Sequence, residues 1–272
     1  MSNQSIALGV EYDGDAFSGF QLQPHAPSVQ QSLESALSTV ANAPIRVAPA
    51  GRTDAGVHAT GQVVAFTAPL SRPLTAWVAG ANAHLPAGVR ITWSQSVDAS
   101  FHPRFSAVAR RYMYVFVERG SRHERLSPLL GRRAVAVPAL DELAMHKAAQ
   151  TFVGEQDFSS VRGAGCQSQS AWRNVHRVVV HRAGPFVVID IAANAFLLHM
   201  VRNIAGVLLQ VGEGRRPEAW VKELLASRDR TKGPATASPH GLYLVHVTYP
   251  GYAFPIAEPP PMLRALGGLE RF

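Results

Sequence analysis

Residues 48–66 read Ala-Pro-Ala-Gly-Arg-Thr-Asp-Ala-Gly-Val-His-Ala-Thr-Gly-Gln-Val-Val-Ala-Phe and place one carboxylate, Asp54, in a loop with a glycine on each side. Glycine lets a backbone turn tightly and lets another molecule approach closely. The β-branched residues within 62–66 predict a strand directly after the loop. A loop carboxylate beside a rigid strand is well placed for chemistry. The same pattern also suits an Asx-turn, in which Asp54 bonds its own backbone.

A second stretch, residues 196–212, predicts a buried helix whose only formal charge is Arg202. A buried cation needs a carboxylate or an anionic ligand, unless its long stem carries it to the surface. The main candidate partners in apolar surroundings are Asp54 and Asp190. We predict that Arg202 meets Asp54, because the pair would keep the carboxylate ionised and fix its direction.

Four motifs carry a family resemblance, at residues 51–58, 110–114, 195–203 and 241–244. In order and spacing they resemble the motifs of the tRNA pseudouridine synthase A family, and the match covers roughly residues 5–250. The resemblance implies an α+β fold, with two similar mixed α/β subdomains whose largely antiparallel sheets flank a central RNA-binding cleft. One departure lies at residues 19–23, which read Gly-Phe-Gln-Leu-Gln where the family usually has Gly-Trp-Gln-Arg-Gln.

Charge is unevenly distributed along the chain. The formal net charge is +7; residues 1–100 contribute −2 and residues 101–272 contribute +9. Residues 101–133 hold 8 Arg against 2 acidic residues. This asymmetry suits a polyanionic partner, although a merely solvated basic face gives the same count.

Composition limits the class of protein. The single cysteine, Cys166, rules out an internal disulfide and a cysteine-based zinc cluster. The first residues do not resemble a signal peptide, and no apolar run is long enough to span a membrane, so we expect a cytoplasmic protein. No metal-ligand motif and no nucleotide-binding glycine pattern is recognised. We therefore expect an enzyme that works through a carboxylate, without a metal or another cofactor.

The chain is expected to divide into an N-terminal subdomain (1–105) with the Asp54 loop, a C-terminal subdomain (106–250) with a tyrosine strand and the Arg202 helix, and a loosely attached, Pro-rich tail (251–272). Local patterns predict further elements: a helix capped by Ser28, a helix at 139–153, a hairpin of strands 175–181 and 186–192, and Asn194 as the cap of the Arg202 helix.

The expected catalytic residues are Asp54, Arg202 and Tyr112; from the residues alone, Tyr112 is equally a core aromatic. Segment 101–105 either stacks on bases and touches phosphate or packs its phenylalanines into a core. Segment 162–166 is either an RNA-gripping loop or an ordinary surface loop. With the family's roles added, the expected substrate-binding residues are Tyr112, Arg52, Arg72, Phe101, His102, Pro103, Arg104, Phe105, Arg110, Arg162, Gly163, Ala164, Gly165 and Cys166.

The resemblance implies that a homodimer isomerises uridine to pseudouridine at positions 38, 39 and 40 of the tRNA anticodon stem-loop, with Asp54 as nucleophile and the target base flipped out. Two other classes stay open. A non-catalytic protein that binds structured RNA would need no paired carboxylate. A glycosidase acting on free nucleosides would need a second carboxylate near Asp54, and no loop motif supplies one.

Overall fold

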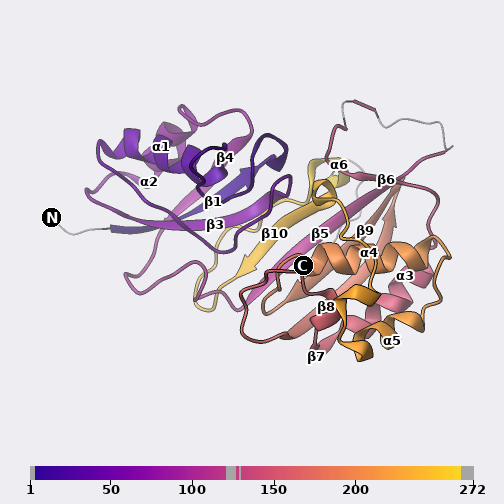
Figure 1. Cartoon of the computed structure of the whole chain (residues 1–272). Helices are drawn as coiled ribbons and strands as arrows, with labels where there is room; N and C mark the ends of the chain where they lie inside the picture. Colours follow the sequence, from indigo (N-terminus) through magenta and orange to yellow (C-terminus); the bar gives the residue numbers. More distant parts are fainter. Residues whose placement is uncertain (1–3, 121–126, 129, 265–272) are drawn as a thin grey trace. The chain divides into compact units, whose positions relative to one another are not determined.

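The computed structural model of the chain describes residues 4–120, 127–128 and 130–264. They fall into two compact units, one of Met1–Val108 with Tyr243–Pro260 and one of Ala109–Leu242 with Pro261–Phe272 (Figure 1). Both units are mixed α/β with mostly antiparallel strands, in agreement with the predicted fold class. Residues 243–250 fall in the first unit, whereas the sequence assigned them to the second. Residues 265–272 of the expected tail lie outside the described residues.

The strands of the first unit follow the order β4-β1-β3-β10, with β2 paired to β3 off this path. Neighbours among the first three strands are antiparallel, and β10 runs parallel to β3 with Tyr243 opposite His58. This pairing explains why the last strand joins the first unit. The strands are β1 (Gln4–Tyr12), β2 (Ala48–Pro49, paired with β3), β3 (His58–Ala68), β4 (Val89–Ser96) and β10 (Leu242–Thr248).

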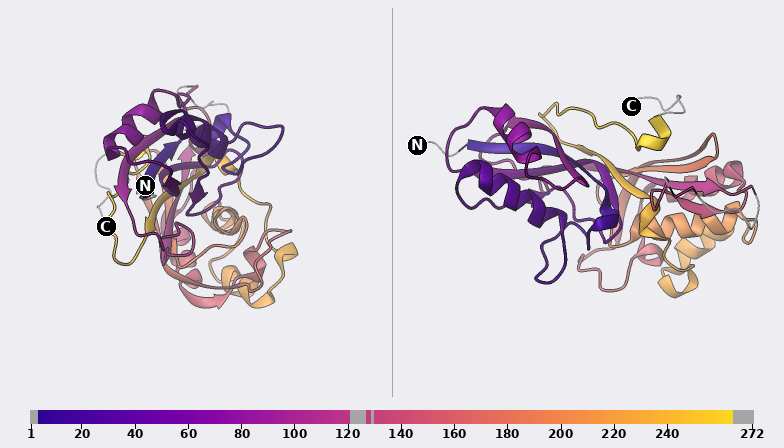
Figure 2. Two further views of the ribbon diagram at one scale, coloured as in Figure 1. Left: turned by 90° about the vertical axis from the view of Figure 1, so that its left-hand side faces the viewer. Right: turned by 90° about the horizontal axis from the view of Figure 1, so that it is seen from above.

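Two helices, α1 (Val29–Ala41) and α2 (Leu74–Asn82), pack side by side on one face of this sheet (Figure 2). The predicted cap of α1 is confirmed, because the Ser28 Oγ accepts a hydrogen bond of 3.2 Å from the Gln31 amide. The helix ends where Asn42 adopts a left-handed conformation, with φ 51°.

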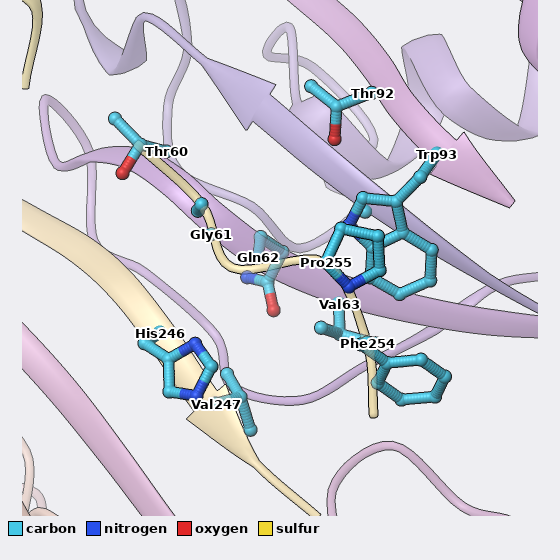
Figure 3. Close-up of a pocket in the computed structure, with 12 residues that line it drawn as sticks. Thr60, Gly61, Gln62, Val63, Thr92, Trp93, His246, Val247, Phe254 and Pro255 are labelled. Atoms are coloured by element: carbon cyan, nitrogen blue, oxygen red, sulfur yellow. The ribbon is translucent and has the colours of Figure 1, made fainter. Parts of the chain in front are cut away.

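Residues 251–260 are more closely attached to the first unit than the sequence suggested. The Phe254 ring stacks on Trp93 at 4.8 Å and meets Phe101, Tyr249 and Tyr252 edge-on or stacked. The segment borders a small pocket (Figure 3), whose lining includes Thr60, Gln62, Trp93, His246, Phe254 and Pro255. None of the candidate site residues lines that pocket. The aromatic contacts hold residues 251–260 on the unit.

The second unit contains the antiparallel sheet β5-β9-β8-β7, with β6 parallel to β5. The predicted β8–β9 hairpin is confirmed. Strand β7 was not predicted, because its residues are only partly covered and show no alternation. The strands are β5 (Ala109–Glu118), β6 (Val135–Val137), β7 (Gly154–Asp157), β8 (Trp172–Ala183) and β9 (Phe186–Ala193).

Helix α4 (Met200–Gly212) is almost entirely buried, packing on α3 (Glu142–Ala149) and β5. The predicted cap at Asn194 is wrong. The helix begins after His199, and the Asn194 Oδ1 instead accepts from the amides of Asn174 and Ala195. The remaining helices are α5 (Trp220–Ser227), α6 (Pro261–Arg264), and the 3-10 turns η1 (Gly14–Ala16), η2 (Gln150–Phe152), η3 (Ser159–Val161), η4 (Arg230–Lys232) and η5 (Pro239–Gly241).

An ion-pair network ties β8, β5 and α3 together. The Arg182 guanidinium lies 2.5 Å from a Glu118 oxygen and 2.7 Å from a Glu142 oxygen. Burial raises the pKa of Glu118, but hydrogen bonds from Arg182 and the Leu140 amide outweigh it and hold that pKa below its ordinary value. The hydrogen bond from Arg182 lowers the pKa of Glu142. Both carboxylates are therefore stabilised in their ionised form by the folded structure.

We expect Arg182→Ala to lower the free energy of unfolding by about 1–2 kcal/mol at pH 7, because it strips two partly buried carboxylates of their partner. Both folded pKa values are depressed, so this stabilisation is fully present above the unfolded pKa of about 4.3 and is lost progressively as pH falls from there through the lower folded pKa values. Urea unfolding at pH 7 and pH 3.5 measures the difference. Arg46→Ala, which removes a pair whose Arg46 side chain is 77% exposed, is the control and should cost little. An Arg182→Ala deficit that is unchanged at pH 3.5 contradicts the assignment.

Candidate active site

The Asp54 loop joins β2 to β3 in the first unit. Its turn is closed by a 3.1 Å hydrogen bond from the Val57 amide to the Asp54 carbonyl. Gly56 supplies the left-handed conformation, with φ 77°. The turn is thus closed by backbone groups. Asp54 itself is half-buried.

Buried side chains brace the same loop from both sides. The Thr53 hydroxyl lies 2.8 Å from the Tyr12 hydroxyl, and the Thr53 carbonyl accepts from the Phe20 amide at 3.0 Å. The Gln62 side chain, 0% exposed, donates to the Gly51 carbonyl at 2.8 Å. Because these bonds flank Asp54 on the chain, they hold its backbone in one conformation. A preorganised carboxylate is what charge-stabilising chemistry needs.

His58 anchors the end of the loop where β3 begins. Its ring is 2% exposed and stacks on Tyr243 at 4.7 Å. Its Nδ1 accepts from the Gly14 amide at 3.1 Å and lies 3.1 Å from an Asp13 oxygen. Sequence reasoning missed Tyr12, Gln62 and His58 as supports. The available signal was a polar residue, Gln62, inside an otherwise apolar strand.

Arg202 lies in the first turn of α4 in the second unit and is half-buried. Its Nε donates to the Ala237 carbonyl at 2.8 Å. The other carboxylate that the sequence offered as a partner, Asp190, is bound by Arg111 through two hydrogen bonds of 2.8 and 2.7 Å. Asp54 and Arg202 belong to different units, and their pairing stays a prediction.

Tyr112 is half-buried on β5, and its ring meets Phe196 edge-on with centroids 5.1 Å apart. Phe196 belongs to the segment that leads into α4, so Tyr112 lies beside the approach to Arg202. Tyr114, on the same face of β5, is fully buried and donates to the Ser238 carbonyl at 2.7 Å. Burial raises the pKa of Tyr114 well above its usual range, while the nearby Arg202 charge acts in the opposite direction.

Loop 162–166 packs against the same approach segment. The Gly163 amide donates to the Leu198 carbonyl at 2.8 Å, and the Leu198 amide lies 3.5 Å from the Cys166 sulfur. The Arg162 guanidinium donates to the carbonyls of Cys166 and Ser168 at 2.7 and 2.6 Å. Arg162 therefore shapes its own loop, and only Ala164 and Gly165 of the five candidate residues are exposed.

Segment 101–105 is divided between packing and exposure. Phe101 joins the aromatic cluster around Phe254, and the buried Pro103 accepts from the Tyr249 hydroxyl at 2.7 Å. Phe105 is 77% exposed. The His102 ring lies 4.4 Å from the Phe105 ring. The Arg104 guanidinium lies over the Phe105 ring, 5.7 Å from its centroid. The core interpretation therefore holds for Phe101 and Pro103, whereas contact of the exposed Phe105 with RNA stays a prediction.

The other candidate residues occupy separate places. Arg52 is exposed in the Asp54 loop, and Arg72 is half-buried just before α2. Arg110, on β5, donates to the Asn194 carbonyl at 3.2 Å. Across residues 4–120, 127–128 and 130–264, His, Cys, Asp and Glu side chains form no group of three suited to a metal ion. Over those same ranges no helix combines the length and apolarity required to span a bilayer.

Comparison with known proteins places the chain among relatives. A family model described as tRNA pseudouridine synthase matches residues 9–106 and 148–250. The tRNA pseudouridine synthase A of Shewanella frigidimarina is 54% identical over 245 residues, covering 90% of this chain and 93% of that protein. The protein of the same name from Salmonella paratyphi B is 52% identical over 257 residues, covering 94% and 93%.

Similarity to solved structures is weak. A crystal structure of a Cbf5-Nop10-Gar1 complex aligns with a TM-score of 0.36 and 13% identity over 75% of this chain, which spans only 45% of that solved chain. The sequence relatives, by contrast, match this chain nearly end to end. On that match, the chain belongs to the tRNA pseudouridine synthase family.

Proposed function

We propose that this isomerase converts uridine to pseudouridine at positions 38, 39 and 40 of the tRNA anticodon stem-loop, in the cytoplasm and as a homodimer. The observation that carries the proposal is the braced Asp54 loop, because buried hydrogen bonds at Thr53 and Gln62 hold one half-buried carboxylate in place. Family membership supports uridine in tRNA as the substrate class. The positions and the dimer rest on the resemblance of the four motifs, and the compartment rests on the sequence features that led us to expect a cytoplasmic protein.

The reaction requires a correctly positioned carboxylate and a site that holds the target nucleotide. The bond between C1′ and N1 breaks, the uracil rotates, C5 bonds to C1′, and the proton on C5 leaves while N1 gains one. Asp54 acts as the nucleophile, as a carboxylate does in glycoside chemistry. Arg202 supplies the opposite charge that pairs with the carboxylate and fixes its direction. Tyr112 lies against the base and assists proton removal at C5.

A base in a stem must leave the stack before Asp54 reaches it, which costs a few kcal/mol. Arg52, exposed two residues before Asp54, holds the flipped nucleotide or fills the space it leaves. Phe105 with His102 and Arg104 forms an exposed platform of two rings and a cation. Such a platform stacks on any base, because every base has a π-face. The basic residues Arg72, Arg104, Arg110 and Arg162 serve phosphate contacts.

We expect Phe105→Ala to weaken tRNA binding about tenfold, since stacking of one base on an aromatic ring is worth about 1–3 kcal/mol. The rate with saturating tRNA should change little, because Phe105 takes no part in the chemistry. Leu143→Ala, which removes an apolar side chain 68% exposed on α3, is the matched control. Equal tRNA affinities for the two variants contradict a stacking role for Phe105.

Mapping pseudouridines in tRNA incubated with the protein tests the proposed function directly. We expect modification at positions 38, 39 and 40 and release of tritium from tRNA labelled at uridine C5. Binding of tRNA without tritium release is the result expected of a non-catalytic RNA-binding protein. Modification confined to other positions rejects the anticodon stem-loop as the target.

A further inference from the structure

We propose that residues 234–238, here called the clasp, hold the Arg202 side chain in its reactive position, and that Asn203 and Thr236 are the positioning residues that fix the clasp. The inference rests on the proposed function, because positioning Arg202 matters only if Arg202 pairs with Asp54 in the reaction. All the contacts that carry it lie within the second unit.

The clasp touches Arg202 at both its side chain and its backbone. The Nε donates to the Ala237 carbonyl at 2.8 Å, and the Ala237 amide donates to the Arg202 carbonyl at 3.3 Å. A guanidinium is planar, so fixing Nε fixes the plane of the whole group. With Nε engaged, a carboxylate is received end-on by the two terminal nitrogens. The position of the Ala237 carbonyl therefore sets the direction in which Arg202 presents its charge.

Asn203, the next residue, connects the clasp to two other segments. Its side chain is 2% exposed, and its Oδ1 accepts from the Thr236 hydroxyl at 2.7 Å and from Arg230 at 3.0 Å. Its Nδ2 donates to the Val161 carbonyl at 2.8 Å. Arg230 also lies 3.3 Å from the Thr236 hydroxyl. Asn203 is buried and Arg230 and Thr236 are half-buried, and a network of this kind favours one arrangement, which gives Thr236 a defined position beside Arg202.

Two further contacts press the clasp onto its surroundings. A Cβ added at Gly206 on α4 would lie 2.9 Å from the Ala235 carbonyl, so the clasp backbone rests directly on the helix. At the other end, the Tyr114 hydroxyl donates to the Ser238 carbonyl at 2.7 Å. The clasp is thus held at every residue from Ala235 to Ser238. Glycine at 206 is required by this close approach, although alanine would favour the helix itself.

The test compares Thr236→Val with Thr236→Ser. Valine keeps the shape of threonine but lacks the hydroxyl that donates a hydrogen bond to Asn203 Oδ1, whereas serine keeps this hydroxyl. Single-turnover pseudouridine formation at saturating tRNA should fall about tenfold in Thr236→Val and return to within about twofold of wild type in Thr236→Ser. The dissociation constant for tRNA should stay within about twofold in both. Gly206→Ala should behave as Thr236→Val does, because it displaces the Ala235 backbone.

Asn82→Ala is the control for a general loss of stability. The Asn82 side chain bonds the Ile91 carbonyl and amide at 2.8 and 2.9 Å in the first unit, where it touches no candidate residue. We expect it to lower thermal stability without lowering the single-turnover rate at 25 °C. The inference is overturned if Thr236→Val has the same single-turnover rate as Asn82→Ala, or if Thr236→Ser is as slow as Thr236→Val.

A parallel variant separates this inference from the proposed function. Arg202→Lys with wild-type activity removes Arg202 from the mechanism, and the clasp then has nothing to position. Loss of activity in Arg202→Lys together with a normal rate in Thr236→Val rejects the clasp alone and leaves the proposed role of Arg202 intact.

Discussion

Asp54→Asn is expected to abolish pseudouridine formation, with a loss of rate on the order of 10⁴-fold or more. The amide is neutral and a poor nucleophile, so it can neither attack the target nucleotide nor stabilise positive charge on the sugar. The fold should be unaffected, because the turn is closed by the Asp54 carbonyl and braced by Thr53 and Gln62, all of which remain. Tritium release from labelled tRNA under single-turnover conditions measures the loss.

Binding separates a chemical defect from a structural one. The variant should bind tRNA within about twofold of wild type, since phosphate contacts dominate the affinity. Asp98→Asn is the control, because Asp98 is an exposed carboxylate of the same unit that accepts from the Tyr252 hydroxyl at 2.7 Å. It should retain full activity. Retained pseudouridine formation in Asp54→Asn would refute the assignment of the nucleophile.

The helices and hairpins with strong local signals could be predicted from the sequence. Ser28 caps α1 because its hydroxyl meets an amide three residues away, a contact within the reach of local pattern. The cap of α4 could not be predicted, since its start depends on His199 adopting a left-handed conformation, with φ 58°. Strand β7 escaped because an edge strand with partly exposed residues needs no alternation.

Long-range placement was the part that sequence pattern could not supply. The parallel pairing of β10 with β3, which brings residues 243–250 into the first unit, joins segments that lie far apart in the sequence and share no local signal. Phe254 looked like part of a loose tail because its partner, Trp93, lies on a distant strand. Hydrophobic periodicity indicates that a residue is buried, but it does not indicate against what.

The candidate site shows the same division between local and distant information. The loop around Asp54 and the charge of Arg202 were visible as exceptions within apolar sequence. The two hydrogen bonds between Arg111 and Asp190, which give that carboxylate a partner of its own, were not visible in the sequence. The sequence of loop 162–166 fits either an RNA-gripping loop or an ordinary surface loop, and it does not reveal that Arg162 bonds carbonyls of its own segment. Such internal use of an arginine is invisible in a count of charges.

Arg202→Lys is expected to lower the single-turnover rate about 100-fold, although the charge is unchanged. Lysine carries a point charge on a flexible stem and has no planar group to be oriented. It therefore loses the bond from Nε to the Ala237 carbonyl and the end-on fork together. Because the net charge is kept, tRNA affinity and its dependence on salt should match wild type. Single-turnover rates and binding titrations at two salt concentrations measure both quantities.

Arg182→Lys is the matched control, since Arg182 also engages carboxylates through a guanidinium, in the Glu118 and Glu142 network. That variant should lose stability while keeping its rate at 25 °C, because the network holds strands and a helix together and reaches none of the candidate catalytic residues. If the two lysine variants lose rate equally, the effect of Arg202→Lys comes from weakened folding. If only the variant at 202 loses rate, the geometry of its guanidinium is what the reaction requires. The positive charge alone then does not account for the role of Arg202. The orientation of its guanidinium, set by the bond from Nε to the Ala237 carbonyl, is also required.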